Sequence, residues 1–486
     1  MICLLFTAMT MSALPPDPGA AGTARETALA PAARPGNPSA ATVRLSVRPM
    51  PAPRPALKYQ LLPELRELNP GNAAYDYLKC FMEQRRFFYS KEAVADRSRY
   101  LAMPLSELPL DKLRDYGGFA LRQADWAARL DTVDWQSLQH IREGGMEQLP
   151  PEVGPLQVLA AALQVRFRAE VAGKHFDSAI RTAKTVFALS RHLGEHPSEV
   201  ANVLGLWVAH LGLNTLTEMV QQPGCPNLYW ALTDLPCPLV DLRKGVQGER
   251  TLLAAELEVL REDAAMTEAD LEEFVSRLSA VMNFAREQGG RSLRNLQPAL
   301  QRRVKDAASV SAARRRLIGA GCAEPLVKKF PPLQVILLDD KRSYEVERDE
   351  RLKLLSLPLW QIDGRTGFQP GRTSADSLET YLASDAGLFS DLLPHISKLR
   401  RTQAELERQI ALLRHVEALR LCAAQNGGKL PARLCDMTAP VPADPVTGRP
   451  FAYAVDVATA HLRADSLPEQ GESISSDVHY EVTILK

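Results

Sequence analysis

Three consecutive stripes of apolar residues between residues 155 and 211 constrain this fold more than any other feature. Within each stripe, apolar residues recur at steps of three and four, which places them on one face of a helix. Only a few residues connect the stripes, so neighbouring helices must run antiparallel. The sequence therefore predicts a mainly α-helical fold, built as an irregular antiparallel helical array. The first stripe comprises Leu156, Leu159, Ala160, Leu163, Phe167 and Val171.

The segment that joins the first two stripes reads AGKHFDSAIRTAK, residues 172–184. It resembles the turn and second helix of a tetratricopeptide repeat, in which a glycine ends one helix, an aromatic residue follows and a small residue lets the helices touch. Ala179 would be that small residue. The resemblance covers one repeat of about 34 residues, and it implies an array that is tetratricopeptide-like in part.

The carboxy-terminal part of the chain has a different pattern. A long helix is expected from about His395 to Gln425, followed by NGG at residues 426–428, which can form a left-handed cap. PVTG then signals a turn, and alternating residues after it predict short strands in a small C-terminal β unit. In outline this resembles the carboxy-terminal part of pseudopilins, on the basis of GGKLP and DPVTGRPFAY. The chain lacks the methylation segment of that family, so we expect no filament assembly.

The amino terminus, MICLLFTAMTMSALPP, has a short apolar run followed by small residues and proline. The run is too short to span a bilayer, which needs about 20 apolar residues, but it suits an export signal. The next residues are rich in Pro and Ala and nearly devoid of aromatic residues, which is typical of a disordered tether. We therefore expect an exported protein of the periplasm or cell envelope, with no transmembrane span in the mature chain.

These patterns predict five segments. They are a probable export signal at 1–13, a Pro/Ala-rich disordered tether at 14–56, a helical array at 57–360, a loop and long packing helix at 361–426, and a small β-containing unit at 427–486.

The charges of the chain balance. Lys and Arg together number 58, as do Asp and Glu, so the net charge is zero. A neutral protein has no overall field to concentrate nucleic acid at its surface, and we expect no nucleic-acid partner.

Three further strings, PNLYWALTDLP, FPPLQVILLDD and ADPVTGRPFAY, resemble segments of uncharacterised exported helical proteins of planctomycete-type bacteria. This resemblance extends over most of the chain after the tether. It implies a compartment and an architecture, but no activity.

Six cysteines remain if Cys3 is lost with the signal. In an exported chain an even number permits disulfides. The pairs closest in sequence are Cys225 with Cys237 and Cys422 with Cys435, and isolated buried thiols are an equally good interpretation. Cys80 and Cys322 complete the set.

One string fits a metal-site pattern. HLGEH, with His192, Glu195 and His196, matches the H-x-x-E-H pattern of inverted zinc metallopeptidases. On a helix, two imidazoles four residues apart could bind one Zn²⁺, with Glu195 as the general base. Pro197 and Gly194 weaken helical geometry at this point, so we expect a solvated helix end and no bound metal.

No other catalytic motif is found in the sequence. It contains no G-x-S-x-G, phosphate-binding loop or dinucleotide fingerprint. Asp339 and Asp340 are adjacent, and adjacent helical residues point about 100° apart, so they should not form an acid/base pair. We therefore expect no cofactor.

The stretch PGCPNLYWALTDLPCP, residues 223–238, lies between two long helical patterns. Asn227 can cap a two-turn helix whose core face carries Leu228, Ala231, Leu232 and Leu235. The opposite side then presents Tyr229, Trp230, Thr233 and Asp234, which could form an aromatic and polar interaction patch. We favour instead a joint between two halves of the array, because the bracketing prolines set the chain direction without any ligand.

Together these features predict an exported helical scaffold or protein-binding module of the cell envelope, with a protein partner and without catalysis. The alternative is a zinc-dependent hydrolase that uses His192, Glu195 and His196.

Overall fold

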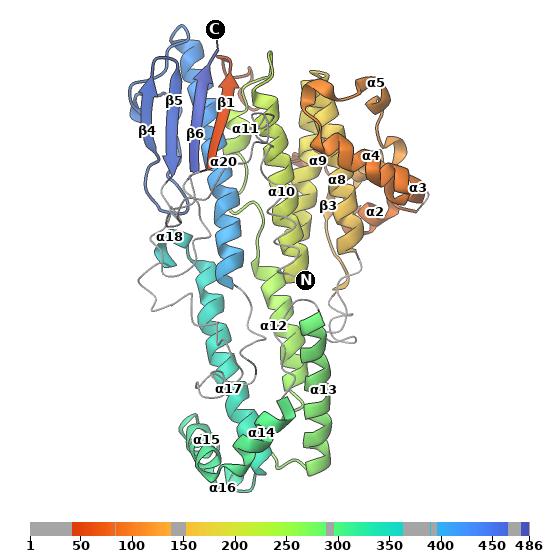
Figure 1. Cartoon of the computed structure of the whole chain (residues 1–486), viewed down its shortest axis with the longest axis vertical. Helices are drawn as coiled ribbons and strands as arrows, with labels where there is room; N and C mark the ends of the chain where they lie inside the picture. The colour runs from red at the N-terminus through yellow and green to blue at the C-terminus, as the bar shows by residue number, and fades with distance from the viewer. Residues whose placement is uncertain are drawn as a thin grey trace, which may run out of the picture.

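The computed structural model describes seven parts of the chain. The protein is mainly helical, with a small mixed four-stranded sheet near the C-terminus, and it is elongated (Figure 1). The predicted export signal lies outside the described residues, as do residues 14–40 of the predicted tether and most of the predicted loop after residue 361. The described residues are 41–82, 84–137, 152–287, 296–362, 389, 396–464 and 478–485.

The three apolar stripes form three long helices, as predicted. They are α8 (Val153–Ala172), α9 (Phe176–Gly194) and α10 (Glu199–Val220). Gly205 lets α9 and α10 approach closely, because a Cβ atom there would lie 2.8 Å from the carbonyl oxygen of Ser190. This bundle forms the centre of the largest of three apolar cores among the described residues.

One helix among the described residues, α10, is long and apolar enough to cross a membrane. Of its most apolar 18-residue window, 72% is buried inside the protein. It packs between α8, α9 and the carboxy-terminal helix, which is the position of a core helix.

Short helices and two short strands cover the outer side of α8 (Figure 1). Asn72 caps the first of these helices by accepting a hydrogen bond from the backbone amide of Ala74. The elements are β2 (Asn69–Asn72), α2 (Ala73–Lys79), α3 (Arg85–Tyr89), α4 (Lys91–Ala102), α5 (Leu110–Leu113), α6 (Gly118–Ala127) and β3 (Leu130–Thr132).

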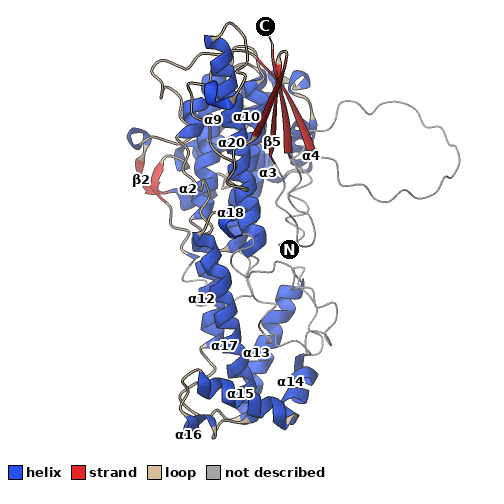
Figure 2. Ribbon diagram, turned by 90° about the vertical axis from the view of Figure 1, so that its left-hand side faces the viewer, coloured by secondary structure: helices blue, strands red, loops and turns tan. Residues whose placement is uncertain are grey.

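Helices α12 to α17 extend away from the bundle as an arm (Figures 1 and 2). The arm has its own apolar core, separate from that of the bundle, so the predicted array at 57–360 contains more than one packing unit. Thr267 and Asp270 exchange hydrogen bonds and cap α13. The arm elements are α12 (Arg243–Leu257), α13 (Glu268–Glu287), α14 (Leu296–Lys305), α15 (Ala307–Gly319), α16 (Glu324–Val327) and α17 (Pro332–Leu352).

The chain returns to the bundle through α18 (Leu359–Ile362) and the long helix α20 (Ile396–Gln425). The predicted NGG cap is confirmed, because Gly427 and Gly428 have φ angles of 61° and 85°. Asp444 then accepts the backbone amides of Val446 and Gly448 and closes the predicted PVTG turn.

The sheet has the strand order β1-β6-β5-β4, and β6 contacts α20. Alternate residues of β1, β5 and β6 are buried and the others are partly or fully exposed, so the sheet has one apolar and one polar face. Figure 2 shows it lying along one side of the helices. The strands are β1 (Ala41–Val47), β4 (Ala452–Asp456), β5 (Thr459–Ala464) and β6 (Val478–Ile484).

The tether prediction is wrong for its last part. Residues 41–47 form β1, which pairs in parallel with β6 at the other end of the chain. Leu45 and Val47 are buried in the largest core, which gives this segment the apolar burial that a disordered tether lacks.

The six described cysteines are free thiols, so neither candidate disulfide is formed. Burial raises the pKa of Cys80 and of Cys225 to about 12, which makes both thiols unreactive.

Candidate functional site

The predicted helix in the proline-rich stretch is α11 (Tyr229–Thr233). Asn227 caps it, as predicted, by accepting the backbone amide of Tyr229 at 3.1 Å. Tyr229 is fully buried, and its hydroxyl donates a hydrogen bond to the carbonyl of Pro440. Helix α20 also packs on α11, so Tyr229 belongs to the core and not to an exposed patch.

The other three residues predicted here lie further out. Trp230 is half-buried, and its ring meets that of Tyr229 edge-on with centroids 5.0 Å apart. The hydroxyl of Thr233 donates to the carbonyl of Tyr229, one helical turn back. Asp234 is exposed at the end of the helix. The four residues thus do not present a single aromatic face to solvent.

A buried ion pair within α20 is hydrogen-bonded to the proline-rich stretch before α11. Arg420 and Glu417 lie 2.7 Å apart and are at most 1% exposed. Arg420 also donates to the carbonyls of Cys225 and Arg48, at 2.8 and 3.1 Å. Asn227 donates to the carbonyl of Glu417 at 2.9 Å. We call these five residues the Arg420 junction. It ties together α20, the segment before α11 and the end of β1.

The HLGEH string does not assemble a metal site. His192, near the end of α9, lies 3.0 Å from the hydroxyl of Tyr77 through its Nδ1 atom. Burial lowers the pKa of His192 to about 4, so the imidazole is neutral at pH 7. His196 is buried and lies 2.8 Å from Oε1 of Glu152 through its Nε2 atom.

The local backbone explains this divergence. Helix α9 ends at Gly194, so the helical spacing that would align the two imidazoles does not continue to His196. The side-chain amide of Asn202 satisfies the terminal carbonyls, including that of His196 at 3.0 Å. Glu195 points elsewhere and forms an ion pair with Lys244. The prediction of a solvated end is wrong for His196, which is fully buried.

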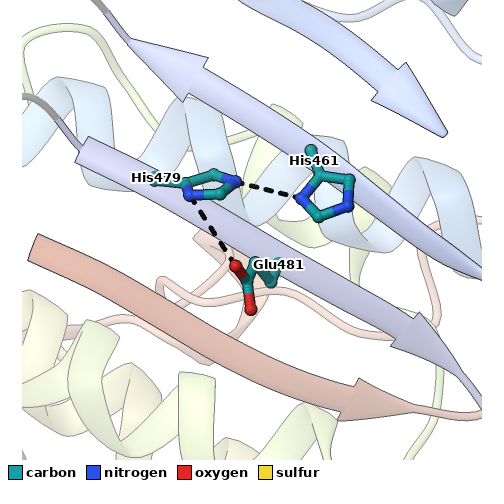
Figure 3. Close-up of side chains that lie close together, drawn as sticks. All are labelled: His461, His479 and Glu481. Atoms are coloured by element: carbon teal, nitrogen blue, oxygen red, sulfur yellow. Dashed lines mark hydrogen bonds and ion pairs between the residues drawn. The ribbon is translucent and has the colours of Figure 1, made fainter. Parts of the chain in front are cut away.

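The described residues contain one group of three side chains that could hold a metal ion: His461, His479 and Glu481 (Figure 3). His461 lies on β5, and the other two lie on β6. Nδ1 of His461 is 3.1 Å from Nε2 of His479, and Nδ1 of His479 is 3.9 Å from Oε1 of Glu481. We call this group the sheet histidine cluster.

Strand register places the three side chains together. Glu481 is directly opposite His461, and His479 is two residues before Glu481, so all three project from the polar face. Arg44 of β1 is opposite Glu481 on its other side, and its Nε donates to Oε2 of Glu481 at 2.9 Å. Arg44, from the other end of the chain, therefore borders the cluster.

Two members of the cluster, His479 and Glu481, have lowered pKa values. Burial and, less strongly, the charge of Arg463 lower the pKa of His479, so its imidazole is neutral at pH 7. The hydrogen bond from Arg44 lowers the pKa of Glu481, so its carboxyl group is ionised.

The sequence analysis missed these residues. The strings TAHLRA and VHYEVTI do alternate, which places His461 with Arg463 and His479 with Glu481 on one face of each strand. Nothing in either string indicates that the two strands pair, or in which register. A shift of one residue would move one histidine to the opposite face.

Comparisons with known proteins found no matching family model, no matching curated protein and no matching solved structure.

Proposed function

We propose that this chain is an exported helical scaffold or protein-binding module of the cell envelope. The observation that supports the proposal most is a set of exposed apolar side chains on α2, in the turn after α2 and on α6, which we call the α2–α6 surface. Its members are Tyr75, Leu78, Met82, Phe119 and Trp126, with exposures of 62, 38, 74, 55 and 49%.

Both helices bury one face and leave the other open. On α2, Tyr77 is fully buried while Tyr75 and Leu78 point outward. On α6, Phe119 and Trp126 are seven residues apart and therefore share the outer face. The two helices are joined by a hydrogen bond of 2.9 Å from Gln123 to Asp76.

The chemistry of these side chains favours a protein partner. Leaving large aromatic rings in water forfeits about 25 cal/mol per Å² of apolar area that burial would recover. Exposed apolar groups that lie close together commonly mark interaction sites, and Trp and Tyr are enriched where partners bind most tightly. A partner that covered the α2–α6 surface would recover that free energy. The proposed partner is therefore a protein with a complementary apolar face.

We also propose that α8 and α9 form a tetratricopeptide-like helix pair within the array. Ala179 is fully buried on α9, where a small side chain allows the two helices to lie close together. Gly173 follows the last residue of α8, just as a glycine ends the first helix of a tetratricopeptide repeat. Repeats of this kind present surfaces for protein binding, in agreement with a scaffold role.

The proposal can be tested in the native host by site-specific photo-crosslinking. A photoreactive residue at Phe119 should give one discrete crosslinked product in the envelope fraction, whereas the same residue at Val457 should give none. Val457 is the matched control, because it is 97% exposed in the turn between β4 and β5. Equal products at both positions would contradict the proposal.

The double substitution Phe119→Ser and Trp126→Ser should abolish copurification of the partner, while the melting temperature stays within about 4 °C of that of the parent.

Export needs its own measurement. Cell fractionation and amino-terminal sequencing should find the chain outside the cytoplasm and lacking its first 13 or more residues. An intact Met1 in the cytosolic fraction would contradict the envelope assignment without affecting the protein-binding role.

A further inference from the structure

The sheet histidine cluster combines two imidazoles and a carboxylate on the polar face of the sheet. Imidazole nitrogen and carboxylate oxygen are ligands that borderline divalent metals accept together. A nitrogen of each imidazole and an oxygen of Glu481 lie within 4.8 Å of one another. We propose that His461, His479 and Glu481 bind one divalent transition-metal ion of the zinc, nickel or copper type.

The distance between the imidazoles is close to that of a loaded site. Two nitrogens bound to one Zn²⁺ at about 2.0–2.1 Å in tetrahedral geometry lie about 3.3 Å apart. Nδ1 of His461 and Nε2 of His479 are 3.1 Å apart, with one of them donating a proton to the other. Replacement of that proton by a metal ion requires the rings to separate by only a few tenths of an ångström.

Glu481 is positioned to supply the third ligand. Its Oε2 atom accepts the hydrogen bond from Arg44, and a carboxylate oxygen of Glu481 lies within 4.8 Å of one nitrogen of each imidazole (Figure 3). Such an outer hydrogen bond fixes the orientation of a metal-binding carboxylate. Arg44 is thus a positioning residue for the site, contributed by the amino-terminal strand.

The surrounding charges select the class of metal. Arg44 and Arg463 are both cationic and exposed, and they oppose any cation held only by electrostatic attraction. Calcium and magnesium need several oxygen ligands, of which this cluster supplies one side chain. Zinc, nickel and copper bind imidazole nitrogen directly and so suit the two histidines. Three protein ligands leave a fourth coordination position open to water or to a further ligand on the polar face.

Metal binding to the full-length, metal-free and untagged chain tests the proposal. Titration calorimetry with zinc chloride should find one site per chain. His461→Gln or His479→Gln should weaken zinc binding by about 100-fold or more, and Glu481→Gln by about 10-fold, the range for changes that disturb a metal site. His175→Gln is the matched control, because His175 is exposed at the turn between α8 and α9, and it should leave the zinc affinity unchanged.

Two outcomes would overturn the proposal: a parent chain that binds no zinc, or histidine variants that bind zinc as tightly as the parent does. Circular dichroism establishes that each variant is folded. If a variant fails to fold, cobalt(II) absorption of the parent decides the question. A visible ligand-field band that added zinc removes supports the site, and absence of the band contradicts it.

Discussion

The bundle and the arm are both held by arginine–carboxylate pairs, but the two regions bury them to different extents. In the bundle, Arg408 of α20 and Asp444 are 4 and 2% exposed and form a bidentate pair. In the arm, Asp339 of α17 is 7% exposed, while its partner Arg316 of α15 is 57% exposed. Water therefore screens the arm pair and cannot reach the bundle pair.

The arm pairs still have a clear structural role. Asp339 binds Arg316 of α15, and Asp340 binds Arg303 of α14 at 2.7 Å. The two carboxylates diverge, as expected for adjacent helical residues, so α17 holds two helices at once. Breaking an arginine–aspartate pair should therefore cost more in the bundle, where both side chains are buried, than in the arm, where the arginine is exposed.

The largest effect is expected from Arg408→Met in the bundle. This change leaves the carboxylate of Asp444 buried without its ionic partner, and it should lower the free energy of unfolding by about 3–5 kcal/mol. Chemical denaturation measures it. Arg122→Met is the control, because the Arg122–Asp115 pair is 62 and 76% exposed, and its loss should cost less than about 1 kcal/mol. Equal losses in the two variants would contradict the comparison.

A smaller loss is expected from Trp230→Ala. Full burial of this ring would make the change cost about 3–5 kcal/mol, but Trp230 is only half-buried, so we expect about 1–3 kcal/mol. Trp126→Ala provides a matched comparison, since Trp126 is 49% exposed on the α2–α6 surface. Thermal melting of both variants measures the difference. A Trp230→Ala protein that melts with the parent would show that the ring of Trp230 contributes no packing to the bundle.

The third prediction concerns pH and the bundle helix α20. Burial raises the pKa of Glu405 to about 7, although Arg408 and Arg401 act in the opposite direction. The folded state thus favours the protonated carboxyl group, and stability is lost as pH rises from about 4.5 through 7. The Glu405→Gln variant has no ionisable group at this position. Its free energy of unfolding relative to that of the parent should therefore increase between pH 5 and pH 8, by on the order of 1–3 kcal/mol. A difference that does not vary with pH would refute this account.

The smallest effect, of opposite sign, is expected in the arm. Burial opposes ionisation of Glu262, but hydrogen bonds from Lys341 and Arg342 outweigh it and lower the pKa of Glu262. The contribution of ionised Glu262 to stability is therefore present above about pH 4.5 and is lost as the pH falls further. Glu262→Gln should lower the free energy of unfolding by about 0.2–1 kcal/mol at pH 7 and should leave it unchanged at pH 3. High salt should reduce the loss at pH 7. Hydrogen exchange in α13 and α17 localises the effect, and a cost that persists at pH 3 would contradict it.

Local features of the fold could be predicted because each depends on residues close together in the chain. The three stripes of α8, α9 and α10, the Asn72 cap and the turn at Asp444 all follow from side-chain spacing and capping chemistry. The packing of α11 could be predicted only in part. Its cap and its core face are as expected, but the burial of Tyr229 depends on α20, nearly 200 residues later in the chain.

The sequence by itself determined the three long helices α8, α9 and α10 and the approximate bounds of α20, and it determined that Asp339 and Asp340 diverge. Tertiary structure decided that residues 41–47 join the carboxy-terminal sheet, that His192 and His196 face different partners, and that His461 meets His479. The physical reason is the range of the interactions. Helical spacing is set within one or two turns, whereas strand pairing and register depend on which distant segments bury their apolar faces together.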